Sequence, residues 1–205
     1  MSRTVAGPRS GEFASARDHY ARALTIREAT LGATHPNTAA SWINLGNAEL
    51  MFGDLAKARD NYEHALQIQE AALGPSHPSV AYSLTNIGVV LHSQGKPTES
   101  LRYYERALHI REQAFGRENP DVAYNLDNLG EVQAELGDLA AAVDYQQRAL
   151  RIREKTLGPE HPLVAASMYS LGVTLGKQRN FAAARERLAA ALAIRERALG
   201  PNHPD

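Results

Sequence analysis

The chain has 205 residues and a balanced charge, with 22 Lys and Arg against 23 Asp and Glu. This balance argues against a nucleic-acid or membrane-surface role, which usually needs an excess of basic residues. Because the chain has no Cys, it offers no disulfide, thiolate nucleophile or Cys-ligated metal. No apolar run approaches the ~18 residues of a membrane-spanning helix, and residues 1–10 lack the apolar segment of a signal peptide. We therefore expect a cytoplasmic protein.

The sequence repeats itself every 42 residues. Copies begin at Gly11, Gly53, Gly95 and Gly137, and a truncated copy begins at Arg179. A repeat of this length is typical of a stacked array, in which each unit buries its apolar face only against its neighbours. The sequence therefore predicts a single array over residues 11–205, and we expect residues 1–10 to be a disordered leader or tag.

Each repeat contains two helical patterns. Apolar residues recur at three- and four-residue steps, as they do on one face of a helix. A Gly follows one helix, and a Pro opens the next. In chain order we expect a lone helix over 12–31 and then helix pairs over 36–73, 78–115, 120–157 and 162–199, about nine helices in all. The first helix of a pair is called helix A below, and the second is called helix B.

Small and large residues recur at fixed places in these pairs. Helix B carries sets such as Ala58, Tyr62 and Ala65, and its clearest motifs are ALHIRE at 107–112 and ALRIRE at 149–154. Helix A carries an apolar residue followed by Gly, at Leu45-Gly46, Ile87-Gly88, Leu129-Gly130 and Leu171-Gly172. These residues resemble the tetratricopeptide repeat (TPR), which usually has ~34 residues. The 42-residue length resembles the kinesin light chain-like type of this repeat. The resemblance implies an all-α fold, a right-handed α-α superhelical solenoid of TPR helix hairpins.

A His-Pro pair precedes most helices A. A ladder of metal ions or a catalytic imidazole is one interpretation of His35, His77, His161 and His203. In the third repeat, however, Asn119 takes the same place, and Asn is among the best N-caps. We therefore predict that these side chains cap helices. The sequence also lacks a phosphate-binding Gly-rich loop, a Ser/His/Asp grouping and an H-E-x-x-H motif. We predict no enzyme activity, no catalytic residue, no metal and no cofactor.

A polar residue precedes the apolar-Gly pair of every helix A. By resemblance, helices A line a concave groove, in which such amides hydrogen-bond the backbone of an extended peptide. An amide both donates and accepts, as a peptide unit does. The alternative is that each amide bridges neighbouring helices A and stabilises the stack. The predicted groove residues are Asn44, Asn86, Asn128 and Ser170, with Asn47, Tyr82, Tyr124, Asp127, Glu131 and Tyr169 around them.

Basic residues are almost missing from helices A. Segments 36–52, 78–94 and 120–136 contain no Lys or Arg, and the fourth segment contains Lys177. Most basic residues belong to helices B, where we expect Arg and Glu to form a solvated outer face. The groove should then be neutral to acidic, most negative at Asp127, Glu131 and Glu135. This departs from the basic grooves of relatives that hold acidic motifs or a terminal carboxylate.

We therefore predict a protein- or peptide-binding scaffold, excised from a larger signalling or adaptor protein. Its partner would be a neutral or basic extended segment with apolar anchors, bound with modest affinity because the segment must become ordered. The three tyrosines are expected either to anchor that segment or to pack between helices A. An alternative is a structural module that associates end to end, because neither terminal helix resembles a polar cap. In that case the uncovered residues would be Phe181, Leu188, Leu192 and Ile194.

Overall fold

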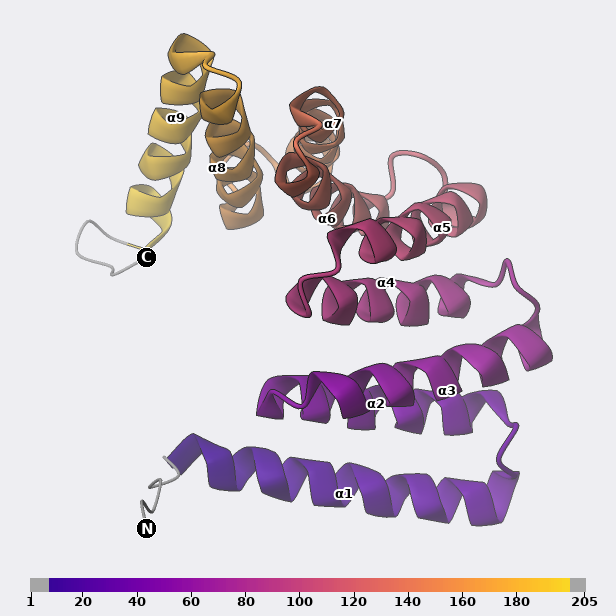
Figure 1. The fold of residues 1–205 in the computed structure, drawn as a ribbon. Coiled ribbons are helices and arrows are strands. Elements are labelled where there is room, and N and C mark those ends of the chain that lie inside the picture. Colours follow the sequence, from indigo (N-terminus) through magenta and orange to yellow (C-terminus); the bar gives the residue numbers. More distant parts are fainter. Residues whose placement is uncertain (1–7, 200–205) are drawn as a thin grey trace. The chain divides into compact units, whose positions relative to one another are not determined.

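The computed structural model describes the backbone of residues 8–199 and the side chains of residues 16–198. This range contains nine α-helices and no strand (Figure 1). The helices are α1 (Pro8–Leu31), α2 (Pro36–Phe52), α3 (Leu55–Leu73), α4 (Pro78–Ser93), α5 (Pro97–Phe115), α6 (Pro120–Leu136), α7 (Leu139–Leu157), α8 (Pro162–Lys177) and α9 (Phe181–Leu199). The predicted all-α array of helix hairpins is confirmed.

The first helix begins earlier than the sequence pattern predicts. α1 begins at Pro8 rather than near residue 12, so it includes the last residues of the expected leader. Residues 1–7 of that leader lie outside the described residues, as does His203. Within the described part of the chain, no helix is both long and apolar enough to cross a membrane.

Contacts divide the chain into two compact units, Met1–Ile110 and Arg111–Asp205. In unit 1, α1 packs against α2, α2 against α3, and α3 against α4. In unit 2, α6 packs against α7, α7 against α8, and α8 against α9. Within each unit these helices therefore pack mainly against their neighbours along the chain. A repeat array requires such packing, because a single hairpin cannot bury its own apolar face.

A side-chain acceptor caps each helix A. The Nδ1 atoms of His35, His77 and His161 accept hydrogen bonds from backbone N–H groups two residues later, at 3.1, 3.2 and 3.1 Å. The Oδ1 atom of Asn119 does the same for α6 at 2.9 Å. These bonds confirm the predicted capping role. Among the described residues, no group of three or more His, Asp and Glu could hold a metal ion.

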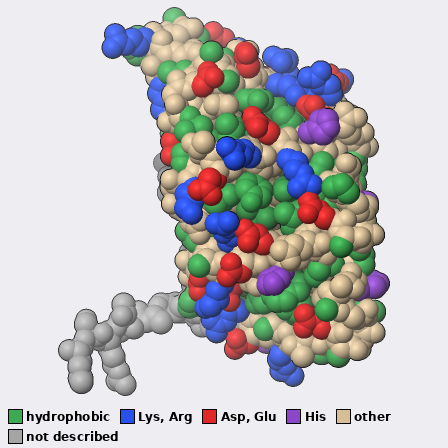
Figure 2. Space-filling view, turned by 45° about the vertical axis from the view of Figure 1, so that its right-hand side comes forward, with side chains coloured by type: hydrophobic (Ala, Val, Ile, Leu, Met, Phe, Trp, Pro, Cys, Tyr) green, Lys and Arg blue, Asp and Glu red, His purple; other side chains and the backbone are tan. Residues whose placement is uncertain are grey.

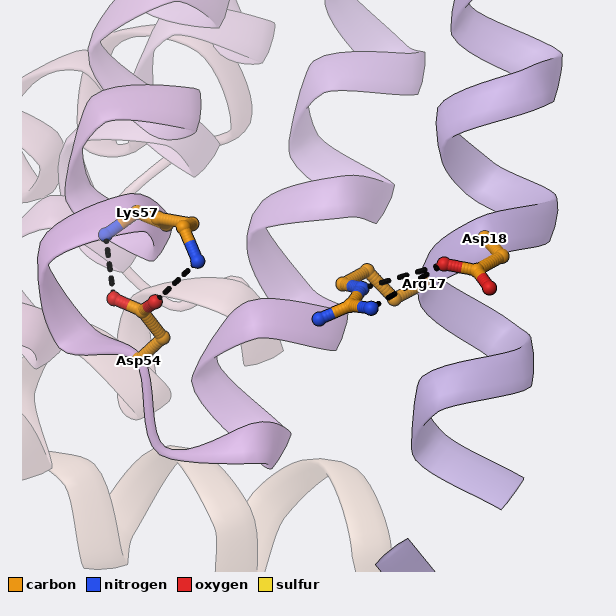
Figure 3. A network of polar contacts seen from close by, with 4 residues as sticks. All are labelled: Arg17, Asp18, Asp54 and Lys57. Atoms are coloured by element: carbon orange, nitrogen blue, oxygen red, sulfur yellow. Dashed lines mark hydrogen bonds and ion pairs between the residues drawn. The ribbon is translucent and has the colours of Figure 1, made fainter. Parts of the chain in front are cut away.

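Three helices B are capped by an Asp or Asn. Asp54 accepts from the backbone N–H of Lys57 at 3.1 Å and pairs with the Lys57 ammonium at 2.7 Å (Figure 3). These contacts with Lys57 lower the pKa of Asp54. Asp138 caps α7, and Asn180 caps α9. Figure 3 also shows Arg17 beside Asp18, an exposed pair that contributes little to stability.

The two helices of a pair approach closely where a Gly faces a large side chain. A Cβ atom placed on Gly46 would lie 2.6 Å from Cε1 of Tyr62. On Gly88 it would lie 2.6 Å from Cε1 of Tyr104. Both tyrosines are almost completely buried. The missing Cβ therefore makes the space that each aromatic ring occupies.

We predict that Gly88→Ala lowers the free energy of unfolding by about 1–3 kcal/mol, because the new methyl group would overpack against the buried Tyr104 ring. The matched control is Gly176→Ala in α8, where the nearest atom to a new Cβ is the Cβ of Ala184 at 3.9 Å. This control should be neutral or stabilising by up to about 1 kcal/mol, since Ala is the better helix former. Urea unfolding measures both, and equal effects would contradict the packing.

Candidate functional site

The predicted amides lie on helices A of both units. Asn44 and Asn86 belong to α2 and α4 in unit 1, whereas Asn128 and Ser170 belong to α6 and α8 in unit 2. All four residues are partly buried. The Nδ2 atoms of Asn86 and Asn128 are buried and find no hydrogen-bond partner among the described residues. A buried donor without an acceptor lowers the stability of the fold. An acceptor from a bound molecule would remove this cost at both amides.

The predicted tyrosines are half-exposed. Tyr82 in unit 1 is 47% exposed, and Tyr124 and Tyr169 in unit 2 are 51% and 49% exposed. The Arg195 guanidinium lies 5.4 Å from the ring centroid of Tyr169, within reach of a cation–π interaction. A part of each ring therefore packs within its unit, and another part can be reached from outside.

Asn47 already has a partner within the fold. Its Oδ1 atom accepts a hydrogen bond from the Tyr62 hydroxyl at 2.7 Å. Tyr62 in turn packs against Gly46. In the described structure Asn47 therefore helps to hold the aromatic ring between α2 and α3.

Arg153 of α7 does not belong to a solvated outer face, and the prediction is wrong at this position. The Arg153 side chain is 11% exposed, pairs with the Asp127 carboxylate of α6 and donates to the Ser167 hydroxyl of α8. One long side chain thus links two helices A. The charge of Asp127, predicted to be among the most negative groups, is consequently compensated.

The residues at the place of Arg153 in two earlier helices make a similar contact with a Ser of the next helix A. Arg27 donates to the Ser41 hydroxyl at 2.5 Å, and Gln69 accepts from the Ser83 hydroxyl at 2.7 Å. The repeated Ser, 14 residues after each Arg or Gln, is the sequence signal that could have identified this contact. Figure 2 shows basic and acidic side chains interspersed over the visible face.

Four of the predicted site residues come together in unit 2. Asp127 and Glu131 of α6, with Tyr169 and Ser170 of α8, line a hollow of about 290 Å³. Gln146 of α7, which is not among the predicted groove residues, also lines it. The remaining lining residues are Ala134, Val173, Thr174 and Lys177. The other predicted residues of unit 2, Asn128 and Tyr124, do not line this hollow, and Asn44, Asn47, Tyr82 and Asn86 belong to unit 1.

Burial dominates the electrostatics of Asp127. It raises the pKa of this carboxyl group from its ordinary value of 3.8 to about 6, while Arg153 opposes the rise and Glu131 adds to it. The folded protein therefore binds this proton more tightly than the unfolded chain does. The resulting stabilisation is fully present below about pH 4 and is lost as the pH rises through about 6.

We predict that raising the pH from about 5 to about 7.5 lowers the free energy of unfolding of the wild type by about 1 kcal/mol more than that of Asp127→Asn. The amide has the same size as the carboxyl group but does not titrate. Urea unfolding at both pH values measures the difference. Asp144→Asn, at an exposed position on α7, is the control and should behave like the wild type. The same pH dependence in Asp127→Asn and the wild type would contradict the buried carboxyl group.

The apolar residues predicted to be uncovered on α9 differ from one another. Phe181 and Leu192 are 69% and 57% exposed, and Leu188 is partly buried. Ile194 is 4% exposed and belongs to a core cluster with Leu150 of α7. The prediction is therefore wrong for Ile194, because this side chain faces the packed side of α9.

The helix hairpins, the Gly-aromatic contacts and the capped helix starts define a TPR protein. The tetratricopeptide repeat family model matches residues 9–71, 42–113, 79–155 and 121–197, and the chain belongs to this family. Its 42-residue repeat is of the kinesin light chain-like type. Repeats of this family generally mediate binding to proteins or peptides. A comparison with curated protein sequences gives no significant match.

Solved structures share the fold. The chain is similar to BtubC (BKLC) from P. vanneervenii, with 26% identity, a TM-score of 0.83, and coverage of 96% of this chain and 78% of the other. It is also similar to a Podosopora anserina structure described as kinesin light chain TPR-like repeats that are nearly identical to one another. The identity is 24% and the TM-score 0.79, and the match covers 93% of this chain and 90% of the other. YrrB, described as a TPR protein with an unusual peptide-binding site, has 22% identity, a TM-score of 0.59, and coverage of 94% and 80%.

Proposed function

We propose that the protein is a binding scaffold whose helices A hold an extended protein or peptide segment. The observation that carries this proposal is the pair of buried Nδ2 atoms of Asn86 and Asn128, which have no partner within the described residues. They occupy the same place in successive repeats, 42 residues apart. A backbone carbonyl of a bound segment would remove the penalty of the unpaired donor at either amide.

The side chains around the amides favour a neutral or basic ligand with apolar anchors. Tyr82, Tyr124 and Tyr169 offer half-exposed rings against which apolar or aromatic side chains can pack. Glu131 is exposed and forms no ion pair with any described residue, whereas Arg153 is occupied by Asp127 and Ser167. In this proposal the protein acts by binding alone, in the cytoplasm and within a larger signalling or adaptor protein.

The test is a peptide-array screen followed by affinity measurements on the best ligand. We expect Asn86→Ala and Asn128→Ala each to weaken binding about tenfold, which corresponds to one lost hydrogen bond of about 1.4 kcal/mol. Asn37→Ala, an exposed Asn in the first turn of α2, is the control and should leave the affinity unchanged. Unchanged affinity in both groove variants would remove the amides from the proposed mechanism.

The exposed apolar residues of α9 favour a second candidate function, association between copies of the chain. Phe181, Leu188 and Leu192 line a hollow of about 520 Å³ with Val173 of α8. An exposed apolar surface of this kind is typical of an interaction site. If this surface joins two copies, it acts as a structural contact rather than as a ligand groove.

Self-association predicts that the sedimentation coefficient rises with protein concentration. The double variant Phe181→Ser, Leu192→Ser should remain monomeric over the same range, because it removes two large apolar side chains of α9 that are exposed in the described structure. Met51→Ser, an exposed position on α2, is the control and should associate like the wild type. A wild type that stays monomeric at the highest concentration would rule out this candidate.

A further inference from the structure

The hollow in unit 2 lies where other helix pairs hold an aromatic ring. Tyr62 faces Gly46, and Tyr104 faces Gly88, and each ring fills the space beside its Gly. In the third pair Gln146 faces Gly130, with its Cγ atom 2.6 Å from the position of a Cβ. Gln has no ring, so it leaves room beyond its amide group. We call the resulting hollow, lined by Asp127, Glu131, Gln146, Tyr169 and Lys177, the Gln146 pocket.

The position of Glu131 supports this account of the pocket. Where a tyrosine is present, the Tyr62 hydroxyl donates to Asn47 at 2.7 Å. The residue at the place of Asn47 two repeats later is Glu131, which lines the pocket. The carboxylate therefore lies where it could accept a hydrogen bond from a group in the place of the missing phenol.

Two residues that line the pocket carry buried acceptors without donors. Gln146 is 3% exposed, and its Oε1 atom is buried without a hydrogen-bond partner in the described structure. The Oδ1 atom of Asp127 is also buried without a hydrogen-bond partner, whereas the Oδ2 atom pairs with Arg153. Two buried acceptors that lack donors are costly, and a ligand that carries N–H groups would satisfy both.

We propose that the Gln146 pocket receives the guanidinium group of an arginine from the bound segment. A guanidinium is planar, carries five N–H donors and can bond two acceptors at once, whereas a lysine ammonium is a compact point charge. The half-exposed Tyr169 ring, over which the Arg195 guanidinium already lies at 5.4 Å from the centroid, forms a wall of the pocket. This inference rests on the proposed function, and it adds one residue type to the ligand.

Charges of both signs surround Asp127. Glu131 on α6 is acidic, and Arg153 on α7 is already bonded to Asp127 and Ser167. On α8, Tyr169 is neutral and Lys177 is exposed, and Arg195 of α9 lies beside the Tyr169 ring. Because burial raises the pKa of Asp127, part of its charge is lost in mild acid. Binding of the arginine should therefore tighten as the pH rises from about 5 to about 7.5.

The probe is N-acetyl-arginine N-methylamide, titrated into the full chain and followed by NMR. We expect binding at millimolar concentration, with shift changes that concentrate at the backbone amides of Glu131 and Ser170, which line the pocket. The citrulline analogue, which has nearly the same shape but no charge, should bind about tenfold more weakly, because hydrogen bonds to a charged group are stronger.

Three variants separate the pocket from the rest of the fold. Gln146→Tyr copies Tyr62 and Tyr104, and should fill the pocket and weaken binding at least tenfold. Gln146→Leu copies Leu188, which faces Gly172 in the fourth pair, and removes the carbonyl acceptor without adding a ring. Gln147→Tyr, at the exposed neighbouring position, is the matched control and should bind like the wild type.

The outcomes distinguish this inference from the proposed function. Loss of binding in Gln146→Tyr and Gln146→Leu, with binding kept in Gln147→Tyr, supports the pocket. No binding of the arginine probe to the wild type, or equal binding to Gln146→Tyr, overturns it. If peptides from the array depend on Asn128 but not on Gln146, the pocket is wrong and the scaffold proposal stands. If no peptide binds the chain, the scaffold proposal fails, and the arginine probe still decides the pocket.

Discussion

The packing of a Gly against one large side chain determines how closely the two helices of a pair can approach. A Cβ at Gly46 or Gly88 would collide with a tyrosine ring, so neither position tolerates a larger residue without movement. Because each repeat is stabilised through its neighbours, a change at one such contact affects the helices on both sides. The contacts between the two helices of a pair depend on this spacing.

The side chain that faces the Gly differs from pair to pair. Tyr62 and Tyr104 fill their places with a ring, Gln146 fills its place in part, and Leu188 fills it with a flexible apolar group. A repeat array can therefore keep its fold while it opens a polar hollow at one pair. In this protein the opened place is also the one where Asp127 and Arg153 form their partly buried pair.

Much of this fold could be predicted from the sequence because it depends on local patterns. Periodic apolar residues predicted the helices, and the replacement of His by Asn119 predicted the caps. The long-range reach of side chains could not be predicted in the same way. Periodicity places Arg153 on a helix but does not say that its stem crosses to Asp127 and Ser167. Likewise, the sequence does not show that Gln146 lies against Gly130, where the earlier pairs have a tyrosine ring against the Gly.

The histidine caps also determine which ring nitrogen of each imidazole is free to donate. His35, His77 and His161 each use the Nδ1 lone pair to accept a hydrogen bond, so in the neutral ring the proton resides on Nε2. The starts of α2, α4 and α8 therefore each carry an imidazole N–H donor. The start of α6 differs, because Asn119 accepts through its carboxamide oxygen and carries an amide NH2 group instead.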